Sequence, residues 1–373
     1  MKKAIKIRLF PTKEQELLML KSIGCSRFAY NWALDKCNER YKNNENYSIS
    51  EIRKQFTQLK KEEDFKWLNE VSSHTTQEAI RNLNKAFKEF FNKKSNYPKF
   101  KSKRKSKQSF YVRCDNLYFK DNLCNIEKIG KVKFKTNIII PKYSKYGNTY
   151  CSFNGRCWVL SFCVEVKENQ ITLNQDLSIG IDLGISKLAT CSNGKVFKNI
   201  NKSKRVKNLK SKLRHLQRNV SRKYESNKQE NKFIKTNNII KLENQIKKIY
   251  RKLSNIRNNH IHQITNKIIK YYPYRIVMED LNISGMMKNK HLSKAIAEQC
   301  FYEFIRQIKY KCEFNGVKFI QADRFYPSSK TCSCCGSIKK DLKLKDRVYK
   351  CECGLSIDRD LNASVNLSNY SKA

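Results

Sequence analysis

The segment SIGIDLGISKLATC, residues 178–191, places an aspartate directly after an apolar run. The residues before Asp182 are typical of a buried strand, Gly184 predicts a tight turn, and the second apolar run predicts a returning strand. A carboxylate at the end of a buried strand is costly unless a cation or a hydrogen-bond donor compensates its charge. The segment therefore predicts a β-hairpin whose first strand carries a functional acid.

Two further acids occupy comparable positions. Glu279 closes the apolar run RIVME, and Asp360 begins the helix predicted for the end of the chain. A strand bearing Asp with its hairpin, a later strand ending in Glu, and a helix bearing Asp fit an α/β sheet of the ribonuclease H type. Converging carboxylates can hold two Mg²⁺ or Mn²⁺ ions roughly 4 Å apart, an arrangement that assists phosphodiester hydrolysis. We therefore predict that Asp182, Glu279 and Asp360 are catalytic metal ligands.

Two neighbouring acids are weaker candidates. Asp280 directly follows Glu279 and is expected to point to the other side if the strand continues. Asp358 is expected to cap the terminal helix or to support the ligands. Because a single aspartate after a strand is more often a turn or cap residue, the prediction depends on the three acids taken together.

The cysteines predict a second metal site, whose ligands are soft thiolates. Most of the 15 are scattered and are expected to be buried thiols, but five cluster near the end of the chain. Cys332, Cys335, Cys351 and Cys353 form C-x-x-C-G and C-x-C-G knuckles, which predict one structural Zn²⁺ in a ribbon at about 328–355. The second knuckle is one residue tighter than usual, and Cys334 is an alternative ligand.

The net charge indicates a polyanionic partner. Lys and Arg number 78 against 33 Asp and Glu, a formal net charge of +45. No apolar run reaches the roughly 20 residues of a membrane-spanning helix, and the first 15 residues lack the apolar core of a signal peptide. We expect a cytoplasmic protein that binds nucleic acid and has no membrane partner.

The rest of the chain predicts further helices and strands. The apolar positions predict a strand at 3–10, a Thr12-capped helix at 13–24, a second helix at 26–41, a helix at 74–93 with Leu83, Phe87, Phe90 and Phe91 on its apolar side, a β unit at 117–173 that includes the run IIIP, a basic helical hairpin at 201–270 and a helix at 294–314.

Several residues are candidates for nucleic-acid contacts. The loop 97–113 interleaves cations with aromatic rings, a pattern that binds phosphates and stacks on bases, although a solvated loop is an equally good interpretation. Gln77, near a helix start, is a candidate for reading a base edge. The candidates are Arg27, Asn31, Gln77, Lys99, Lys101, Lys103, Arg104 and Tyr111, whereas Phe28 and Trp32 are expected in the core.

A competing motif is HIH at 260–262, which resembles the metal pair of nickases that use a tyrosine nucleophile. Two such histidines share a face only on a strand. The surrounding sequence predicts a helix, so the two side chains are expected to diverge. This pattern disfavours a phosphotyrosine transposase.

The combined motifs resemble TnpB, the OrfB-type proteins of bacterial insertion sequences and relatives of type V CRISPR nucleases. The resemblance covers nearly the whole chain and rests on KIRLFPTKEQ, SRFAYNWAL, YPKFKSK, GIDLGISKLAT, IVMEDLNI, YPSSKTCSCCG and CECGLSIDRDLNAS. The family's three RuvC acids correspond to Asp182, Glu279 and Asp360, and its zinc knuckles to Cys332, Cys335, Cys351 and Cys353. The tighter second knuckle departs from the commoner C-x-x-C form.

The resemblance implies a domain organisation and an activity. Residues 1–175 would form a wedge β unit (about 1–15 and 116–175) with a helical recognition insert (about 16–115), and residues 176–373 an RNase H-like (RuvC) nuclease domain carrying the zinc ribbon. The family's activity is RNA-guided DNA cleavage, with a guide RNA from the transposon end and double-stranded target DNA beside a short motif. The alternative is a transposon-encoded nucleic-acid-binding regulator with an inactive RuvC fold.

Overall fold

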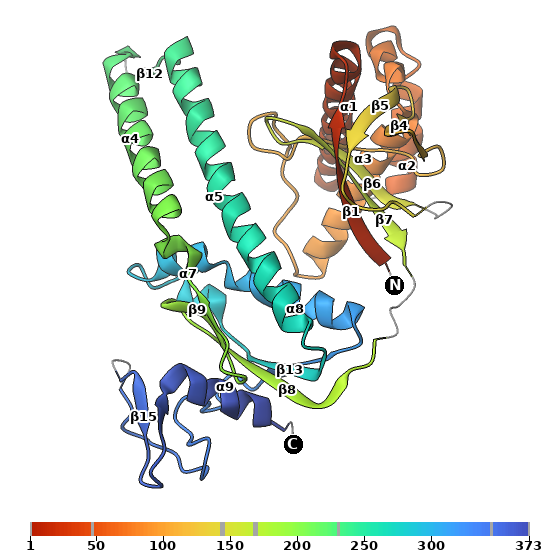
Figure 1. Ribbon diagram of the computed structural model, residues 1–373. Helices are drawn as coiled ribbons and strands as arrows, with labels where there is room; N and C mark the ends of the chain where they lie inside the picture. The colour runs from red at the N-terminus through yellow and green to blue at the C-terminus, as the bar shows by residue number, and fades with distance from the viewer. Residues whose placement is uncertain are drawn as a thin grey trace. The chain divides into compact units, whose positions relative to one another are not determined.

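The computed structural model describes residues 2–45, 48–141, 146–166, 171–229, 232–343 and 346–371. The chain divides into two compact units, Met1–Lys167 and Glu168–Ala373, each with its own sheet and core. Figure 1 labels the elements of both units.

The first unit is built on an antiparallel sheet with the strand order β2-β6-β7-β1-β5-β4-β3. It confirms the predicted β unit, except that the run IIIP forms no strand and Ile139 is 91% exposed. The strands are β1 (Lys2–Phe10), β2 (Ser109–Tyr111), β3 (Phe119–Lys120), β4 (Leu123–Ile126), β5 (Gly130–Lys135), β6 (Gly147–Phe153) and β7 (Trp158–Glu165).

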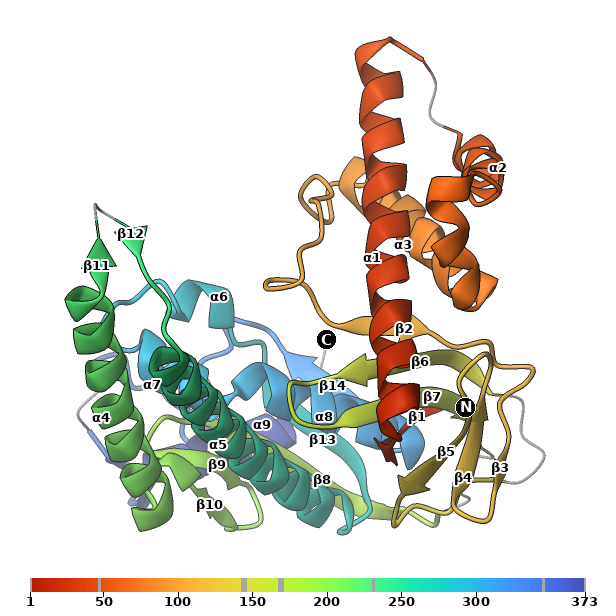
Figure 2. The same ribbon diagram turned by 90° about the horizontal axis from the view of Figure 1, so that it is seen from above.

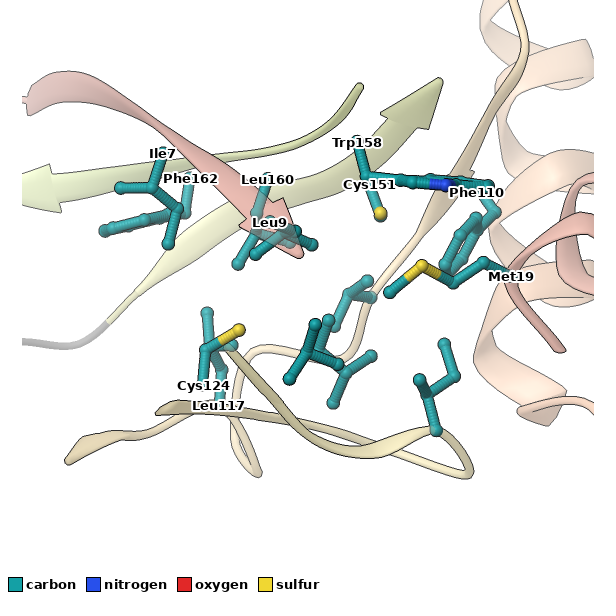
Figure 3. Packing of buried hydrophobic residues seen from close by; sticks show 14 of the residues in the cluster. Ile7, Leu9, Met19, Phe110, Leu117, Cys124, Cys151, Trp158, Leu160 and Phe162 are labelled. Atoms are coloured by element: carbon teal, nitrogen blue, oxygen red, sulfur yellow. The ribbon is translucent and has the colours of Figure 1, made fainter. Parts of the chain in front are cut away.

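Strand β1 shows why this sequence forms a half-buried sheet. Ile5, Ile7 and Leu9 are buried, and the residues between them are exposed. Figure 3 shows Ile7 and Leu9 packed with side chains of β7, and Met19 of the following helix beside Phe110. This core fixes the start of the helix that follows β1.

That helix corrects the prediction of two separate helices. The structure has one 30-residue helix, α1 (Lys13–Lys42), which begins with the predicted capping box of Thr12 and Gln15 and runs through Gly24 without a break (Figure 2). A central glycine costs up to about 1 kcal/mol relative to alanine. Burial on both sides of it offsets that cost, because Met19 and Ile23 join the sheet core while Cys25 and Ala29 join a helical core.

The helical core combines α1 with α2 (Ile49–Leu59), the 3-10 helix η1 (Glu63–Glu70) and α3 (Ser73–Phe91). Leu83 and Phe87 lie in this core as predicted. Phe91 does not, since it is 67% exposed at the last turn of α3. The buried face of α3 is instead completed by Ala79 and Ile80, about three turns before Phe91.

The second unit contains a five-stranded sheet with the order β10-β9-β8-β13-β14. The predicted hairpin is β8 (Asn174–Leu183) and β9 (Lys187–Cys191), followed by β10 (Val196–Lys198) and the short 3-10 helix η2 (Ile200–Lys202). Strands β13 (Pro273–Glu279) and β14 (Lys318–Ala322) are parallel to β8, so the sheet is mixed. One face packs against α5 and α8, described next.

The predicted helical hairpin is α4 (Lys204–Ser226) and α5 (Asn237–Ile269), with the two-residue strands β11 (Lys228–Gln229) and β12 (Lys232–Phe233) at its tip (Figures 1 and 2). His260 and His262 lie within α5 as expected, about 200° apart around the helix axis, so they cannot form the nickase metal pair. His260 instead contacts the carbonyl oxygen of Lys198 at 3.0 Å.

Short helices follow β13. These are α6 (Ile283–Met286), α7 (Ser293–Gln299) and α8 (Phe301–Phe314). The single helix predicted at 294–314 is therefore wrong, because Cys300 has the left-handed backbone conformation, φ +56°, which ends α7 and starts α8. Gln299 is buried at this junction and donates to the carbonyl oxygens of Gly184 and Ile185 in the β8–β9 turn.

The last helix covers the opposite face of the sheet. Strands β15 (Val348–Lys350) and β16 (Ser356–Asp358) form a hairpin that leads directly into α9 (Arg359–Asn369). Leu367 of α9 packs with Val277 of β13 and Ala322 of β14. At Gly180 of β8 the backbones nearly touch, since a Cβ there would lie 1.9 Å from the Ser364 carbonyl oxygen.

The close contact at Gly180 predicts intolerance to any side chain. We expect Gly180→Ala to lower the free energy of unfolding of the second unit by more than about 3 kcal/mol, because backbone must move to admit the methyl group. Thermal or urea unfolding measures the effect. The control is Gly24→Ala, whose Cβ would meet nothing within 4 Å and which should be neutral or stabilising by up to about 1 kcal/mol. Equal stability of the two variants would contradict the packing described.

Candidate active site

The three predicted acids lie on the α9 face of the five-stranded sheet. Side chains alternate along a strand, so Asp182 shares a face with Gly180, and Glu279 with Val277. The register pairs Gly180 with Val277 and Ile181 with Met278, so Asp182 and Glu279 are the next residues on neighbouring parallel strands. Asp360 is added from the first turn of α9.

The acids interact electrostatically. The pKa of Asp182 is raised well above its ordinary value, first by burial and then by the nearby charges of Glu279 and Asp360. Burial and the two neighbouring acids both disfavour the charged form of Asp182, which a cation would favour. Oxygen ligands in such a cluster have the donor chemistry that Mg²⁺ and Mn²⁺ prefer, so the residues fit divalent ions.

The two weaker candidates have other partners. Asp280 accepts from the guanidinium of Arg324 at 2.6 Å. Asp358 is the N-cap of α9, as predicted, and accepts from the backbone amides of Asp360 and Leu361 at 3.0 and 3.2 Å. Both carboxylates are thus satisfied by protein donors.

Lys187, at the start of β9, supplies a cation beside the acids. Its ammonium lies 2.8 Å from a carboxylate oxygen of Asp358 and 3.7 Å from one of Asp360. Burial acts to raise the pKa of Asp358, but hydrogen bonds from Lys187 and from backbone amides outweigh it and lower that pKa. Sequence reasoning missed Lys187, because its contact depends on how the hairpin meets α9.

The four predicted cysteines meet at one point. Their sulfur atoms all lie within 4.8 Å of one another, and the pairs Cys332–Cys353 and Cys335–Cys351 are 3.6 Å apart. Tetrahedral Zn²⁺ with bonds of about 2.3 Å separates its sulfurs by about 3.8 Å, so the set fits zinc. Among the residues that the structure describes, no other group of three or more ligand side chains is gathered so closely.

Local geometry explains the two knuckles. Gly336 and Gly354, which close them, have φ of +75° and +90°, the left-handed region that glycine occupies without strain. The Ser337 side chain and its backbone amide hydrogen-bond to Cys335 and lower its pKa to about 6, which favours the thiolate that zinc binds. Cys334 is exposed and lies outside the cluster.

Helix α9 holds the first knuckle as well as an acid. Asn362 is fully buried, donates to the Thr331 carbonyl oxygen at 2.7 Å and accepts from the Ser333 amide at 3.0 Å. The zinc ribbon and the acid cluster therefore share one helix. The last motif of the sequence contains Asn362, but the partners of this side chain could not be derived from spacing.

Three of the predicted nucleic-acid contacts are engaged within the protein. Asn31 accepts from the backbone amide of Lys101 and donates to its carbonyl oxygen, at 2.8 and 2.9 Å. The Lys101 ammonium lies 3.6 Å from the centre of the Tyr30 ring, and burial lowers its pKa to about 8. Tyr111 packs edge-on against Tyr150. These residues anchor the basic loop to α1 and to the sheet.

The other candidates remain accessible. Lys99, Lys103 and Arg104 are exposed on the loop. Arg27 lines an aromatic pocket of about 660 Å³ with Trp67 and Phe100.

Gln77 lines a second pocket, of about 930 Å³, formed by α2, η1 and α3. Its lining contains no acid and includes the cations Arg53, Lys54, Lys60, Lys61 and Lys66. A concave lining whose charged residues are all cations suits a phosphate-bearing ligand.

A basic groove on α4 was not predicted. Arg214, Arg218 and Arg222 follow one another at intervals of four residues and line it with Gln217 and Ser221. That spacing places the three guanidinium groups on one exposed face, about 6 Å apart along the axis. The interval of four is visible in the sequence and could have identified the groove.

Comparison with known proteins gives the family. Three family models match, described as a helix-turn-helix domain at residues 1–46, a probable transposase at 161–290 and a Cas12f1-like TNB domain at 301–367. A "Putative RNA-guided DNA endonuclease" of Streptomyces pristinaespiralis is 30% identical, over 98% of this chain and 88% of that protein. The chain belongs to the TnpB family. Within the described residues 2–45, the regular elements are nevertheless one strand and one continuous helix.

Other relatives agree with this assignment. The "Putative RNA-guided DNA endonuclease InsQ" of Escherichia coli K12 is 28% identical, over 98% of this chain and 91% of the relative. Among solved structures, the Cas12f1–sgRNA–target DNA complex has a matching chain with a TM-score of 0.63 and 13% identity, covering 99% of both chains. This TnpB-family protein therefore has the α/β fold of Cas12f1. Within its described residues, no helix is long and apolar enough to cross a membrane.

The cysteine geometry predicts which thiols bind zinc. We expect purified wild-type protein and Cys334→Ser to contain one zinc per chain, and Cys332→Ser to lose it and to unfold at a lower temperature, because structural zinc sites contribute folding free energy. Elemental analysis and thermal unfolding measure both effects. Loss of zinc in the Cys334 variant, or its retention in the Cys332 variant, would show that the ligand set is different.

Proposed function

We propose that this TnpB-family chain is an RNA-guided DNA endonuclease of a transposable element, which cuts DNA by two-metal-ion hydrolysis at one RuvC-type site. The observation that carries the proposal is the placement of Asp182, Glu279 and Asp360 on one face of the sheet, with the raised pKa of Asp182. The names of the two long relatives support the same activity.

The domain assignment is part of the proposal. The wedge unit, at about 1–15 and 116–175, contains six strands of the seven-stranded sheet, and the helices at about 16–115 are its recognition insert. Strand β2 joins this sheet from the end of the insert. Residues 176–373 form the RuvC-like nuclease domain with the zinc ribbon inserted at about 328–355. The order of strands β8, β9, β10, β13 and β14 and the crossing of α9 support an RNase H-like sheet.

The chemistry follows from the acid cluster. Two Mg²⁺ or Mn²⁺ ions held by Asp182, Glu279 and Asp360 would activate water and stabilise charge on the scissile phosphate. The chain itself orients these carboxylates, through the register of β8 with β13 and the N-cap of α9. Lys187 offsets part of the charge of Asp360 and holds the start of α9 against β9.

The net charge of +45 suits a guide RNA from the transposon end paired with target DNA. Base pairing reads the target sequence, so the protein needs to bind the sugar-phosphate backbone and to read only a short motif in duplex DNA beside the target. The exposed lysines of the basic loop and the arginines of α4 are positioned for backbone contacts.

The proposed catalytic role of Asp182 has a direct test. We expect Asp182→Asn to reduce cleavage to background while guide RNA and target DNA still bind. Without divalent ions the same variant should melt at a higher temperature than wild type, because it removes a carboxylate that Glu279 and Asp360 repel. Guided cleavage with magnesium, gel-shift binding and thermal unfolding measure these effects.

The matched control is Asp176→Asn, an exposed acid on the same strand, which should leave cleavage and melting unchanged. Cleavage at the wild-type rate by the Asp182 variant would remove that residue from the site. A wild-type chain that binds guide and target but never cuts would favour the regulator with an inactive fold.

The arginine groove of α4 predicts salt-dependent binding. Replacing Arg214, Arg218 and Arg222 with alanine should weaken nucleic-acid binding and reduce the slope of log affinity against log salt by about 2–3, since each phosphate contact contributes about 0.7–0.9. None of the three has an ion-pair partner within the described residues. The control removes the same charge from Arg40, Arg81 and Arg306, which are paired with acids. If the two triple variants weaken binding equally, the groove makes no specific phosphate contacts and contributes only to the general attraction between the positively charged protein and nucleic acid.

A further inference from the structure

Glu279 has a protein partner outside the acid cluster. The hydroxyl of Ser328 donates to its Oε1 atom. Ser328 is only 3% exposed and lies in the segment that connects β14 to the first zinc knuckle. The contact joins the end of β13 to a residue 49 positions later in the chain.

Ser328 is part of a tightly hydrogen-bonded turn. The carbonyl oxygen of Pro327 accepts from the amides of Lys330 and Thr331, each at 3.0 Å. Asn366 of α9 donates to the carbonyl oxygens of Ser328 and Thr331, each at 2.7 Å. The hydroxyl is therefore fixed by the backbone on which it is carried.

The same turn continues into the zinc site. Thr331 also accepts from Asn362, one turn earlier on α9, and the next residue is the zinc ligand Cys332. The buried Tyr349 of β15 donates to the Lys330 carbonyl oxygen at 3.0 Å. The knuckle, α9 and the hydroxyl that contacts Glu279 thus form one connected unit.

We propose that Ser328 is a positioning residue, which orients the carboxylate of Glu279 for divalent ions and couples the zinc ribbon to that orientation. The inference rests on the proposed function of the three acids. A carboxylate that accepts a fixed hydrogen bond loses less rotational freedom when it binds an ion. Partners of this kind typically change metal affinity or activity by about 10–100-fold when they are removed.

The test compares Ser328→Ala with Ser333→Ala. Ser333 lies on the same segment, which hydrogen bonds hold to α9. Its backbone amide donates a hydrogen bond to Asn362, and the substitution retains this amide. Manganese binding is measured by electron paramagnetic resonance without DNA, and the magnesium concentration for half-maximal cleavage is measured with guide and target. Zinc content and target affinity are measured on every sample.

We expect Ser328→Ala to weaken manganese binding and to raise the half-maximal magnesium concentration, each about 10-fold, with zinc content and target affinity unchanged. Excess magnesium should restore most of the cleavage. Asn366→Ala should act in the same direction and should not add to Ser328→Ala, because both disturb one contact. Ser333→Ala should behave like wild type.

The outcomes separate the two proposals. A zinc-loaded Ser328 variant with wild-type manganese affinity and magnesium requirement would overturn the positioning role, as would an equal shift in the Ser333 variant. If Ser328→Ala does not fold, the test uses Asn366→Ala and wild-type protein stripped of zinc. Both must need more magnesium for half-maximal cleavage than zinc-loaded wild type, and otherwise the positioning role is rejected. Absence of cleavage by wild type would reject the nuclease function. A manganese shift in Ser328→Ala and Asn366→Ala, with none in Ser333→Ala, would still support the contact with Glu279.

Discussion

The near-contact between the backbones of β8 and α9 at Gly180 constrains the second unit of this chain. Any side chain at this position would overlap Ser364, so the helix lies at backbone distance from the strand. Asp182 is two residues further along the same face of β8, and Asp360 is one helical turn before Ser364. Asp182 and Asp360 therefore approach one another because of where the helix crosses the strand, and the parallel register of β13 adds Glu279.

Gathering acids in this way is costly in any folded protein, and the structure offsets only part of the cost. The N-terminus of α9 points its free amides at Asp358, and the helix dipole favours negative charge at that end. Lys187 adds one ammonium. Asp182 still has a raised pKa, so the cluster retains repulsion that divalent cations would relieve. Incomplete compensation is expected of a site that binds ions, because full neutralisation by protein groups would remove its affinity for them.

Sequence reasoning succeeded where a periodic pattern or a ligand set was local. The alternation in β1, the apolar run of β8, the cap at Thr12 and the four cysteines were predicted because each depends on residues close in sequence. It failed where distant packing decides. The residues before and after Gly24 join two different cores, which keep α1 continuous. Cys300 adopts a left-handed conformation beside Gln299, whose partners are in the β8–β9 turn. The partners of Asn31 and Lys187 could not be predicted for the same reason, because each contact joins residues that are far apart in the sequence.

The segment 351–364 contains both thiolate and carboxylate ligands because the two sites depend on one stretch of backbone. Cys351 and Cys353 follow the last residue of β15, and the hairpin returns through β16 to Asp358, which caps α9. A metal that joins the two knuckles fixes where this helix begins, and α9 in turn holds the turn of Ser328 through Asn366. Zinc would suit this role because it is redox-inert and four thiolates would close the site to substrate. Hard cations would suit the acids because their ligands must exchange with water and phosphate oxygens. With the proposed ions bound, separate chemistry would let one short segment keep a structural ion apart from exchangeable ones.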